Sequence, residues 1–563
     1  MDRQGLWPDS EPDKGCPVPL AESDVMHADQ KFDTIVIGAG VAGLGAAALL
    51  ARDAGERVLV LERAPFIGGR TLSFEGRGNK VVADGIEMDA RAFRKALPLA
   101  HCYLGKCTPS IETIFDQGLL DGRTFEAGGH GLFWGNKSRV DCLMKHLGVQ
   151  WNLPLNRGLG FIAWEGEGKP GKAYQVHKGQ PYPWMSEEGF NATMTQLGDM
   201  ARTSFEDMAR VMNVPLQNWL EQRSMHPEAY DYIKVLAASQ TAQAEPMMTP
   251  AGDFLGYMAI ANRIRMNLVS GSVATADAPG CIAIPQQFEK VLLAHGGTVL
   301  RGTPAREVII EDGVVRGVRI KSEDNEYERD RIIRADKVIC TIPPKYMFRV
   351  LPRQNFPAQW VETLEKKFWG AGLLTGWCGT TRSLMPDLGL EEGSFVYMPG
   401  VIRGEGYIGA VDMVMCDFTA WNSGTAKRGP PGKREYLFST ALTDEEMRNP
   451  DRVNRVIELC EQWAREAFPT WDKDVEFIMW TPSPEAYGLW RPVGENRPDV
   501  KSQWVKGLYF AGDQYGRRLW GGGVDGAALS AVMCVDAMKG SDLESTIMPD
   551  FHRGIPDLEA GAA

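Results

Sequence analysis

The stretch that decides the fold is Phe32-Asp-Thr-Ile-Val-Ile-Gly-Ala-Gly-Val-Ala-Gly43, an apolar run that leads directly into three glycines. The apolar residues have the character of a short strand, and Val41 to Ala54, rich in alanine and leucine, has that of a helix. A second apolar run, Val58 to Leu61, follows and ends at Glu62. This order predicts a β-turn-α-β unit of the kind that binds a dinucleotide.

Each part of the unit has a task in holding a dinucleotide. The first glycine makes a tight turn, the second lets a phosphate approach the backbone, and the third lets the helix pack closely on the strand. The helix N-terminus offers free N–H groups and a partial positive charge to a pyrophosphate. The acid that ends the second strand is placed to bind a ribose. The contacts predicted from this unit are Gly38, Gly40, Val41, Ala42, Gly43 and Glu62.

A second glycine-rich signature lies near the other end of the chain. It begins with Phe510-Ala-Gly-Asp513 and continues with Trp520-Gly-Gly-Gly-Val-Asp-Gly-Ala527. Together with Gly68-Gly-Arg-Thr71, which closely follows Glu62, these motifs resemble the fingerprint of the flavin amine oxidase and carotenoid desaturase superfamily. The resemblance implies that FAD is the cofactor, and an arginine suits its diphosphate because the planar guanidinium can donate bidentately. It adds, as cofactor contacts, Arg63, Gly69, Arg70, Gly512, Asp513 and Val524.

Segments between the two signatures match the same superfamily in the same order. The loop Phe125-Glu-Ala-Gly-Gly-His130 is similar to the loop beside the flavin ring and adds Gly129 as a contact. Residues 306–318 predict a hairpin with a tight Asp312-Gly313 turn, and the resemblance implies that Val308 meets the adenine edge through its backbone. For acid–base catalysis we expect His130 and Glu126, since histidine titrates near neutral pH. The alternative for His130 is a ring that only hydrogen-bonds to the backbone.

The fold class that the resemblance implies is α/β: a two-domain flavoprotein with a Rossmann-like FAD-binding domain and an interleaved α+β substrate-binding domain. The length of 563 residues agrees, because it is too great for one core. Segment 71–125 departs from most relatives, and its role is open. The expected divisions are a flexible tail at 1–31, the FAD-binding domain at 32–145, 281–345 and 490–540, the substrate-binding domain at 146–280 and 346–489, and a C-terminal tail at 541–563.

The composition and charge of the chain limit which partners and which cellular compartment we expect. The formal net charge of −12 argues against nucleic acid, which needs a basic face, and no run approaches the roughly 20 apolar residues that span a membrane. The N-terminal residues lack the pattern of an export signal, and the ten cysteines are scattered. We therefore expect a cytoplasmic protein with reduced thiols and no metal site. Pro246 to Leu268 mixes apolar residues with two arginines, and it predicts either an internal helix or a helix on a membrane surface.

The substrate is inferred from the side chains and from the closing motif. Sixteen tryptophans and 24 methionines suit a pocket for an apolar small molecule, although the same residues also fill ordinary cores. Amine oxidases of the superfamily place an aromatic cage residue where this chain has Gly523. This difference favours the branch of the superfamily that acts on isoprenoids or polyenes.

The predicted function is therefore that of an FAD-dependent oxidoreductase. It would remove a hydride from an allylic or otherwise activated C–H bond of a lipophilic isoprenoid, terpenoid or polyene, giving dehydrogenation, desaturation or hydroxylation. The alternatives are an amine oxidase, a cis–trans polyene isomerase without net redox change, and a prenyl-protein escort factor without enzymatic activity. Because no other G-x-G-x-x-G run lies between a strand-like and a helix-like segment as Gly38 to Gly43 does, the expected electron acceptor is oxygen, a quinone or an electron-transfer protein, and NAD is not expected.

Overall fold

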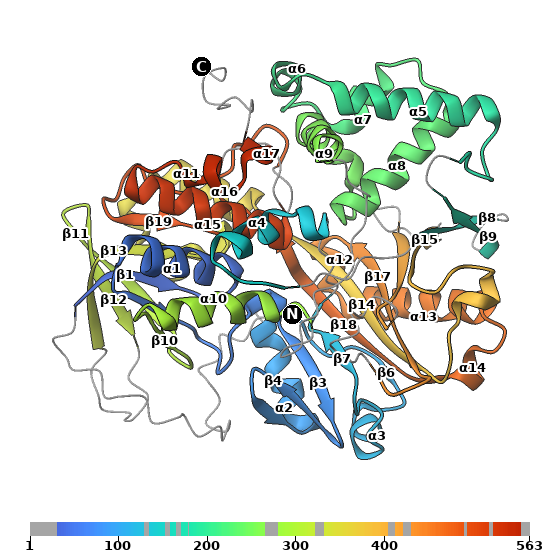
Figure 1. The fold of residues 1–563 in the computed structure, drawn as a ribbon, viewed down its shortest axis with the longest axis horizontal. Coiled ribbons are helices and arrows are strands. Elements are labelled where there is room, and N and C mark those ends of the chain that lie inside the picture. Colours follow the sequence, from blue (N-terminus) through green and yellow to red (C-terminus); the bar gives the residue numbers. More distant parts are fainter. Residues whose placement is uncertain are drawn as a thin grey trace.

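Two large sheets dominate the fold, one mostly parallel and one mostly antiparallel (Figure 1). They form the α/β architecture that the sequence predicted, with helices on the outer faces and between the sheets. The computed structural model describes residues 31–128, 134–151, 158–164, 170–177, 180–264, 280–320, 331–402, 411–419, 429–488, 492–516 and 522–552.

The seven-stranded sheet draws its strands from distant segments: β1 (Lys31–Ile37), β2 (Val58–Leu61), β10 (Thr298–Leu300), β11 (Ala305–Glu311), β12 (Val314–Ile320), β13 (Arg331–Cys340) and β19 (Leu508–Phe510). Their order is β10-β2-β1-β13-β12-β11, and β19 also pairs with β13. The central strands β2, β1, β13 and β19 run parallel to one another. β2 is apolar along its whole length and β1 is apolar from Ile35 to Ile37, because both faces of a parallel sheet are covered.

Three helices pack together over this sheet: α1 (Val41–Ala54), α10 (Ala283–Ala294) and α15 (Gly523–Lys539). The predicted β-turn-α-β unit is therefore confirmed as β1, α1 and β2. The predicted hairpin is confirmed as β11 and β12, whose turn places both Asp312 and Gly313 in the left-handed region. A left-handed backbone at both positions is what a tight hairpin turn of this type requires.

The eight-stranded sheet has the order β6-β18-β14-β17-β16-β15-β8-β9. Its strands are β6 (Cys107–Thr108), β8 (Gly158–Trp164), β9 (Pro170–Val176), β14 (Gly370–Thr380), β15 (Ser394–Ile402), β16 (Val411–Asp417), β17 (Arg434–Leu442) and β18 (Val475–Gly488). All neighbours are antiparallel except β15 and β8. One face is covered by α13 (Pro450–Ala467), whose buried stripe includes Val456, Cys460 and Trp463. The 3.6-residue spacing of these residues places them on the one face of the helix that meets the core.

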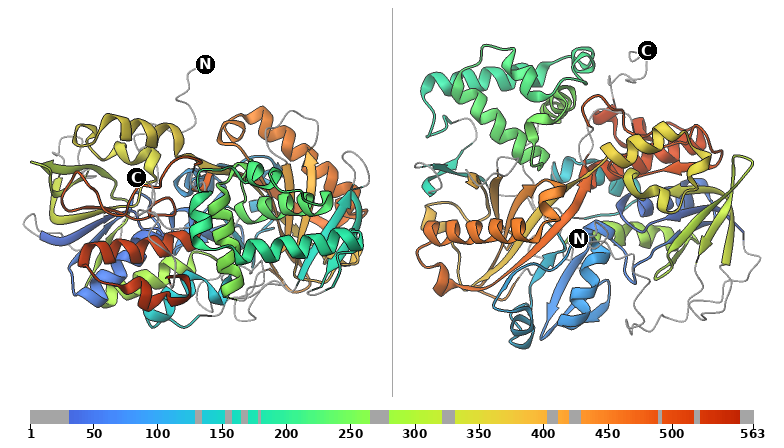
Figure 2. Two further views of the ribbon diagram at one scale, coloured as in Figure 1. Left: turned by 90° about the horizontal axis from the view of Figure 1, so that it is seen from above. Right: turned by 180° about the vertical axis from the view of Figure 1, so that it is seen from behind.

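A separate group of helices stands above the sheets, at the upper right of Figure 1 and the upper left of the right-hand view in Figure 2. It consists of α5 (Glu187–Arg202), α6 (Phe205–Arg210), α7 (Leu216–Glu221), α8 (Pro227–Thr241) and α9 (Ala251–Arg263). α9 packs against α5, α6 and α7 and is buried along most of its length. For Pro246 to Leu268 the sequence predicted either an internal helix or a helix on a membrane surface. The structure shows the internal helix as α9, so the membrane-surface alternative is wrong for α9.

Segment 71–125 forms a small unit of its own. A four-stranded sheet of order β5-β4-β3-β7 contains β3 (Ser73–Arg77), β4 (Lys80–Ala83), β5 (Ile86–Met88) and β7 (Thr124–Glu126). It packs with α2 (Ala90–Ala96), the 3-10 turn η2 (Leu97–Ala100) and α3 (Ile111–Asp116). Because β3 and β7 pair directly, they would make a simple hairpin without the residues between them. We call residues 78–123 the insert.

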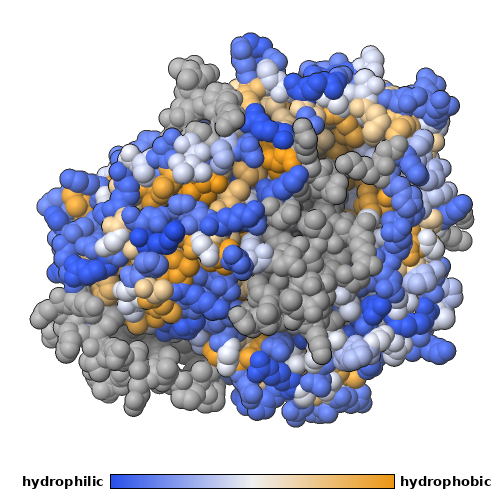
Figure 3. Space-filling model, viewed as in Figure 1, coloured by the Kyte–Doolittle hydropathy of each residue, from blue (hydrophilic) through white to orange (hydrophobic). Residues whose placement is uncertain are grey.

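Short elements complete the described part of the chain: η1 (Gly69–Thr71), η3 (Gly135–Lys137), α4 (Arg139–His146), η4 (Pro246–Met248), η5 (Pro344–Arg349), η6 (Arg353–Asn355), α11 (Ala358–Lys367), η7 (Met385–Leu388), α12 (Asp444–Met447), α14 (Trp471–Asp474), α16 (Leu543–Ile547) and α17 (Pro549–His552). Among the described residues, no helix has the length and apolar character needed to cross a bilayer. The face shown in Figure 3 is largely hydrophilic, with apolar side chains scattered between charged ones.

Candidate functional site

A long cavity of about 580 Å³ lies between the two large sheets. One part, the cofactor half, is lined by the turn after β1, the end of β2, η1, the loop after β13, and the N-terminus of α15. The other part, the sheet half, is lined by strands β14 to β17 and by the last turn of α8. The two halves differ in chemistry, so each is described in turn.

The cofactor half is built on the glycine turn between β1 and α1. Gly38 has a φ of 108°, and a Cβ there would lie 2.2 Å from Thr341 Oγ1. A Cβ on Gly43 would lie 2.0 Å from the carbonyl oxygen of Gly38. The N-cap of α1 is Gly40, which has no side chain to accept from the first N–H groups of the helix. These donors line the cavity and form a site suited to an anion.

Glu62 closes this turn from the end of β2. Its carboxylate accepts the N–H of Ala39 and the N–H of Ala64, each at 2.8 Å. Burial raises the pKa of Glu62, although these backbone donors oppose the shift. Glu62 also lines the cavity, where a ribose hydroxyl would meet its carboxylate. It therefore fixes the glycine turn and stays available to a dinucleotide.

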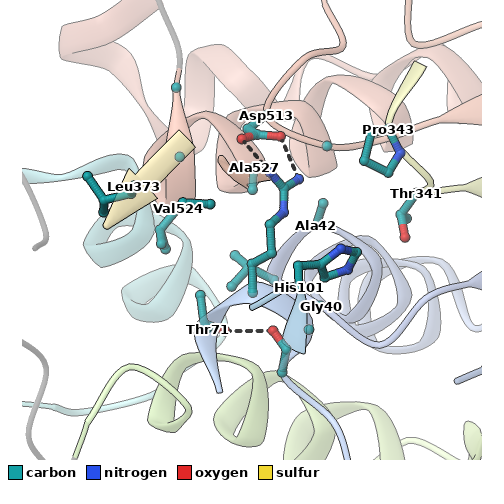
Figure 4. A pocket seen from close by; sticks show the side chains of 18 of the residues that line it. Gly40, Ala42, Thr71, His101, Thr341, Pro343, Leu373, Asp513, Val524 and Ala527 are labelled. Atoms are coloured by element: carbon teal, nitrogen blue, oxygen red, sulfur yellow. Dashed lines mark hydrogen bonds and ion pairs between the residues drawn. The ribbon is translucent and has the colours of Figure 1, made fainter. Parts of the chain in front are cut away.

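Positive charge is concentrated in the cofactor half, which is lined by Arg63, Arg70, Arg306 and Arg349, and His101 lies in the same wall. The guanidinium of Arg70 pairs with Asp513 at 3.0 Å, as the dashed lines in Figure 4 show. Burial lowers the pKa of Arg63, and repulsion from Arg349 adds to the shift. A bound diphosphate would offset this repulsion, so the wall fits the phosphates of FAD.

The N-terminus of α15 also opens onto the cavity. Its N-cap, Gly522, leaves the first N–H groups without a side-chain partner, and Val524 lines the wall. Asp525 accepts the backbone N–H of Arg139 at 2.6 Å and pairs with its guanidinium at 3.0 Å. Burial raises the pKa of Asp525, and Arg139 opposes the shift. The terminus is thus anchored to α4 and can stabilise negative charge on a bound ring.

Most of the predicted cofactor contacts meet at this cavity. Those that line it are Gly38, Gly40, Val41, Ala42, Gly43, Glu62, Arg63, Gly69, Arg70, Gly512, Asp513 and Val524. Gly129 and His130 lie outside the described residues, so their predicted roles stay predictions.

Two predicted residues lie elsewhere. Val308 is fully buried in the core, and its N–H donates to the carbonyl of Val350 at 2.8 Å. Pro304, Ala305 and Arg306 line the cavity at this strand, whereas Val308 does not. Glu126 does not line the cavity; its carboxylate accepts the hydroxyl of Ser73 and the N–H of Cys281 just before α10. These contacts give Glu126 a structural task in the fold.

The sheet half is a largely apolar surface made by alternate residues of adjacent strands. Leu373 of β14 lies opposite Ala441 of β17. The next rows across the sheet are Ser439, Val414 and Tyr397, then Leu437, Cys416 and Phe395. All of these residues line the cavity, because side chains two apart on a strand share one face. The rows offer an apolar floor broad enough for a hydrocarbon chain.

Polar groups enter the sheet half at few points. The hydroxyl of Tyr397 donates to the carboxylate of Asp412, and both residues line the cavity. Burial and the neighbouring carboxylate raise the pKa of Tyr397. Tyr346 lies further along the wall, and its hydroxyl donates to Glu485.

Several lining residues were missed from the sequence. Asp412 and the end of α8 carry no recognisable motif, because the sheet half is assembled from separate segments, and Tyr346 lies in η5 after β13, outside any motif. His101 and Leu99 belong to the insert, for which the resemblance offered no guide. The period-two alternation in β16 and β17 was the available signal for the sheet half.

The comparisons with known proteins agree on the family. The family model described as "Flavin containing amine oxidoreductase" matches residues 41–539. A phytoene desaturase (neurosporene-forming) from Cereibacter sphaeroides is 26% identical over 113 residues, which cover 20% of this chain and 20% of the desaturase. The match thus spans about a fifth of that enzyme's length.

Solved structures show the same fold. An oxidoreductase from Methanosarcina mazei superposes with a TM-score of 0.60 at 18% identity, covering 91% of this chain and all of that one. Putrescine oxidase bound to putrescine superposes with a TM-score of 0.58 at 16% identity, covering 91% of this chain and 100% of that chain.

Proposed function

The chain belongs to the family of flavin-containing amine oxidoreductases, and from this premise we propose that it removes a hydride from an allylic or otherwise activated C–H bond of a lipophilic isoprenoid, terpenoid or polyene. FAD is the cofactor, and when bound it supplies the hydride acceptor. The product would be a desaturated or hydroxylated form of the same skeleton. The observation that supports the proposal most is the apolar floor of the sheet half, which is continuous with the cofactor half.

The floor would bind the substrate by burying its hydrocarbon surface. Leu373, Val414 and Leu437 belong to successive rows of the floor, so a chain lying along them would contact apolar side chains throughout. Each CH₂ group removed from water contributes about 0.8 kcal/mol. In Figure 4, Leu373 lies beside Val524 at the N-terminus of α15, which marks the boundary between the two halves. A C–H bond held at this boundary would be oriented for reaction and shielded from water.

A desaturation also releases a proton, which a group in the wall must accept. Tyr346 lines the cavity and donates its hydroxyl proton to Glu485. Burial raises the pKa of Glu485, and Tyr346, Lys345 and Arg448 oppose the shift. We assign the proton to this pair: the Tyr346 oxygen accepts it while its own proton passes to the Glu485 carboxylate.

Amine oxidation is the second candidate, and Asp412 favours it. Its carboxylate lies in the wall of the sheet half, where an ammonium group of a substrate would pair with it. Putrescine oxidase, a fold neighbour, was solved with an amine bound, which adds to this alternative. The Gly523 position, where the family's cage aromatic is missing, argues the other way.

An anaerobic titration of the purified holoprotein separates the two candidates. The visible flavin absorbance would be followed while polyenes, terpenes and amines of matched chain length are added. Bleaching by a polyene or terpene supports the proposal, and bleaching by amines alone refutes it in favour of amine oxidation. Asp412→Asn is the matched control: it should abolish reduction by amines and leave reduction by hydrocarbons intact.

The same preparation tests the remaining alternatives. A protein that holds FAD, never bleaches and changes the double-bond geometry of a polyene would be an isomerase. A colourless protein that binds prenylated peptides would be an escort factor. After reduction, oxygen, a quinone and an electron-transfer protein would be compared as acceptors by the rate at which the absorbance returns.

A further inference from the structure

The insert reaches the cavity at one place in the described structure, the short stretch that contains Leu99 and His101. It interrupts the pairing strands β3 and β7, where Ser73 lies opposite Glu126. Phe93 of the insert packs edge-on against Phe74 and Phe125 of the flanking strands, and Phe125 in turn contacts Trp377 of β14. The insert is thus packed between the small sheet and the eight-stranded sheet, and it brings a histidine to the cofactor half.

Hydrogen bonds to the eight-stranded sheet hold this stretch in place. The N–H of Tyr103 donates to the carbonyl of Pro482 at 3.0 Å, and the N–H of Gly105 donates to Trp480 at 2.8 Å. The hydroxyl of Ser483 donates to the carbonyl of His101 at 2.8 Å. The backbone of His101 is therefore fixed from the side of β18.

The opposite side of the stretch faces the glycine turn. η2 packs against η1, and the guanidinium of Arg63 donates to the carbonyl of Leu99 at 3.4 Å. η1 in turn lies on the turn itself, since the N–H of Gly68 donates to the carbonyl of Ala39 at 3.0 Å. His101, Gly40 and Ala42 line the same cavity and are drawn together in Figure 4.

The backbone of His101 is held in an uncommon conformation. Its φ is 63°, in the left-handed region that non-glycine residues rarely occupy. Its N–H caps η2 by donating to the carbonyl of Pro98 at 3.2 Å. A glycine would adopt this conformation at no steric cost, so a side chain retained here is consistent with a task for the ring.

The electrostatic surroundings define what the ring can do. Burial lowers the pKa of His101 well below its usual range, and Arg63, Arg70 and Arg349 lower it further. A neutral imidazole keeps one N–H donor. These cations, together with the N–H groups at the start of α1, make this part of the wall suited to the oxygen atoms of a phosphate, to which an imidazole N–H can donate.

We propose that His101 is a cofactor-binding residue supplied by the insert, whose ring N–H donates to the diphosphate of FAD from the side opposite the glycine turn. The diphosphate is then held on two sides, by the N-terminus of α1 and by a residue anchored to the eight-stranded sheet. The proposal concerns cofactor retention and does not depend on which substrate the enzyme oxidises.

Affinity for FAD is the direct test. FAD would be removed, and its dissociation constant measured from the quenching of flavin fluorescence on reconstitution, for wild type, His101→Leu and His101→Asn. We expect about tenfold weaker binding for His101→Leu, because a hydrogen bond to a charged acceptor is lost. His101→Asn should recover part of the affinity, since asparagine tolerates the left-handed backbone and carries an N–H donor.

Two controls separate a contact from a packing effect. Tyr103→Phe removes the 2.9 Å hydrogen bond to the carbonyl of Met447 in the same insert and should leave FAD affinity unchanged. Competition by ADP, which carries the diphosphate without the flavin, should weaken in His101→Leu by the same factor as FAD binding. Wild-type FAD affinity in both His101 variants would overturn the proposal. Equal losses in Tyr103→Phe, or an unchanged affinity for ADP, would overturn it as well.

Discussion

Replacing Gly43 by alanine should cost the protein its cofactor. The added Cβ would lie 2.0 Å from the carbonyl oxygen of Gly38 and 3.2 Å from Val36 Cγ1, whereas ordinary contacts begin near 3.4 Å. The start of α1 must therefore shift by more than 1 Å from the turn, against backbone that cannot rotate away. Overpacking of this kind costs about 1–3 kcal/mol or more. It outweighs the roughly 1 kcal/mol by which alanine favours a helix over glycine.

The shift matters for function because it moves the N–H groups that line the anion site. We expect Gly43→Ala to be purified with little FAD and to melt at a lower temperature than wild type. Gly45→Ala, two residues further along the same helix, is the matched control: its Cβ would lie 3.4 Å from Ala531 Cβ and from Leu143 Cδ2. This variant should keep FAD and wild-type stability. A Gly43→Ala protein with full FAD content and an unchanged melting temperature would refute the reasoning.

Three further substitutions test other parts of the structure. Glu126→Gln should lower the melting temperature, because losing a buried hydrogen-bond acceptor costs about 1–3 kcal/mol. The substitution should not slow flavin reduction. Slower reduction at unchanged stability would restore a catalytic role for Glu126. Asp525→Ala should destabilise the fold by about 3–5 kcal/mol, because the buried guanidinium of Arg139 loses its ion pair with Asp525. Wild-type stability of this variant in chemical denaturation would contradict the prediction. Burial lowers the pKa of Lys345 to about 8 in the folded protein, whereas a lysine in the unfolded chain titrates near about 10.4. Between about pH 8 and about pH 10.4 the unfolded chain therefore binds more protons than the folded protein, and the free energy of unfolding rises with pH. Relative to wild type, Lys345→Met should therefore be more stable at pH 7 than at pH 10; a difference independent of pH would contradict the assignment.

The cofactor half could be predicted because its chemistry is local in sequence. A tight turn, a close phosphate approach and close helix packing each require glycine at a fixed offset, and Gly38, Gly40 and Gly43 meet those needs within six residues. Arg70 and Asp513 are distant in sequence, yet each lies in a motif that is recognisable alone. Their 3.0 Å pairing follows once both motifs are placed on one cofactor.

The predicted contact between Val308 and adenine shows what a hydrophobic pattern cannot identify. Alternation along β11 places Val308 in the core, as its full burial and its hydrogen bond to Val350 show. The strand meets the cavity at its beginning, at Ala305 and Arg306, where no apolar residue marks the position. A hydrophobic pattern identifies which residues are buried, but it does not identify which backbone segment a ligand approaches.

The sheet half could not be predicted for a different reason. Its floor is a set of cross-strand rows, such as Ser439, Val414 and Tyr397, and such rows exist only once the strand register is fixed. β15, β16 and β17 are separated by long connections, so no local spacing relates these residues. The polar pairs Tyr397 with Asp412 and Tyr346 with Glu485 are likewise made by folding alone.

The insert connects the two halves of the cavity. Through β6 it adds a strand to the eight-stranded sheet, where Thr108 lies opposite Ile478, and through η2 it packs on η1 beside the glycine turn. A displacement of one sheet relative to the other would therefore pull His101 away from the cofactor half. If His101 holds the diphosphate as proposed, the hydrogen bond from Ser483 of β18 to its carbonyl would link the cofactor half to the eight-stranded sheet.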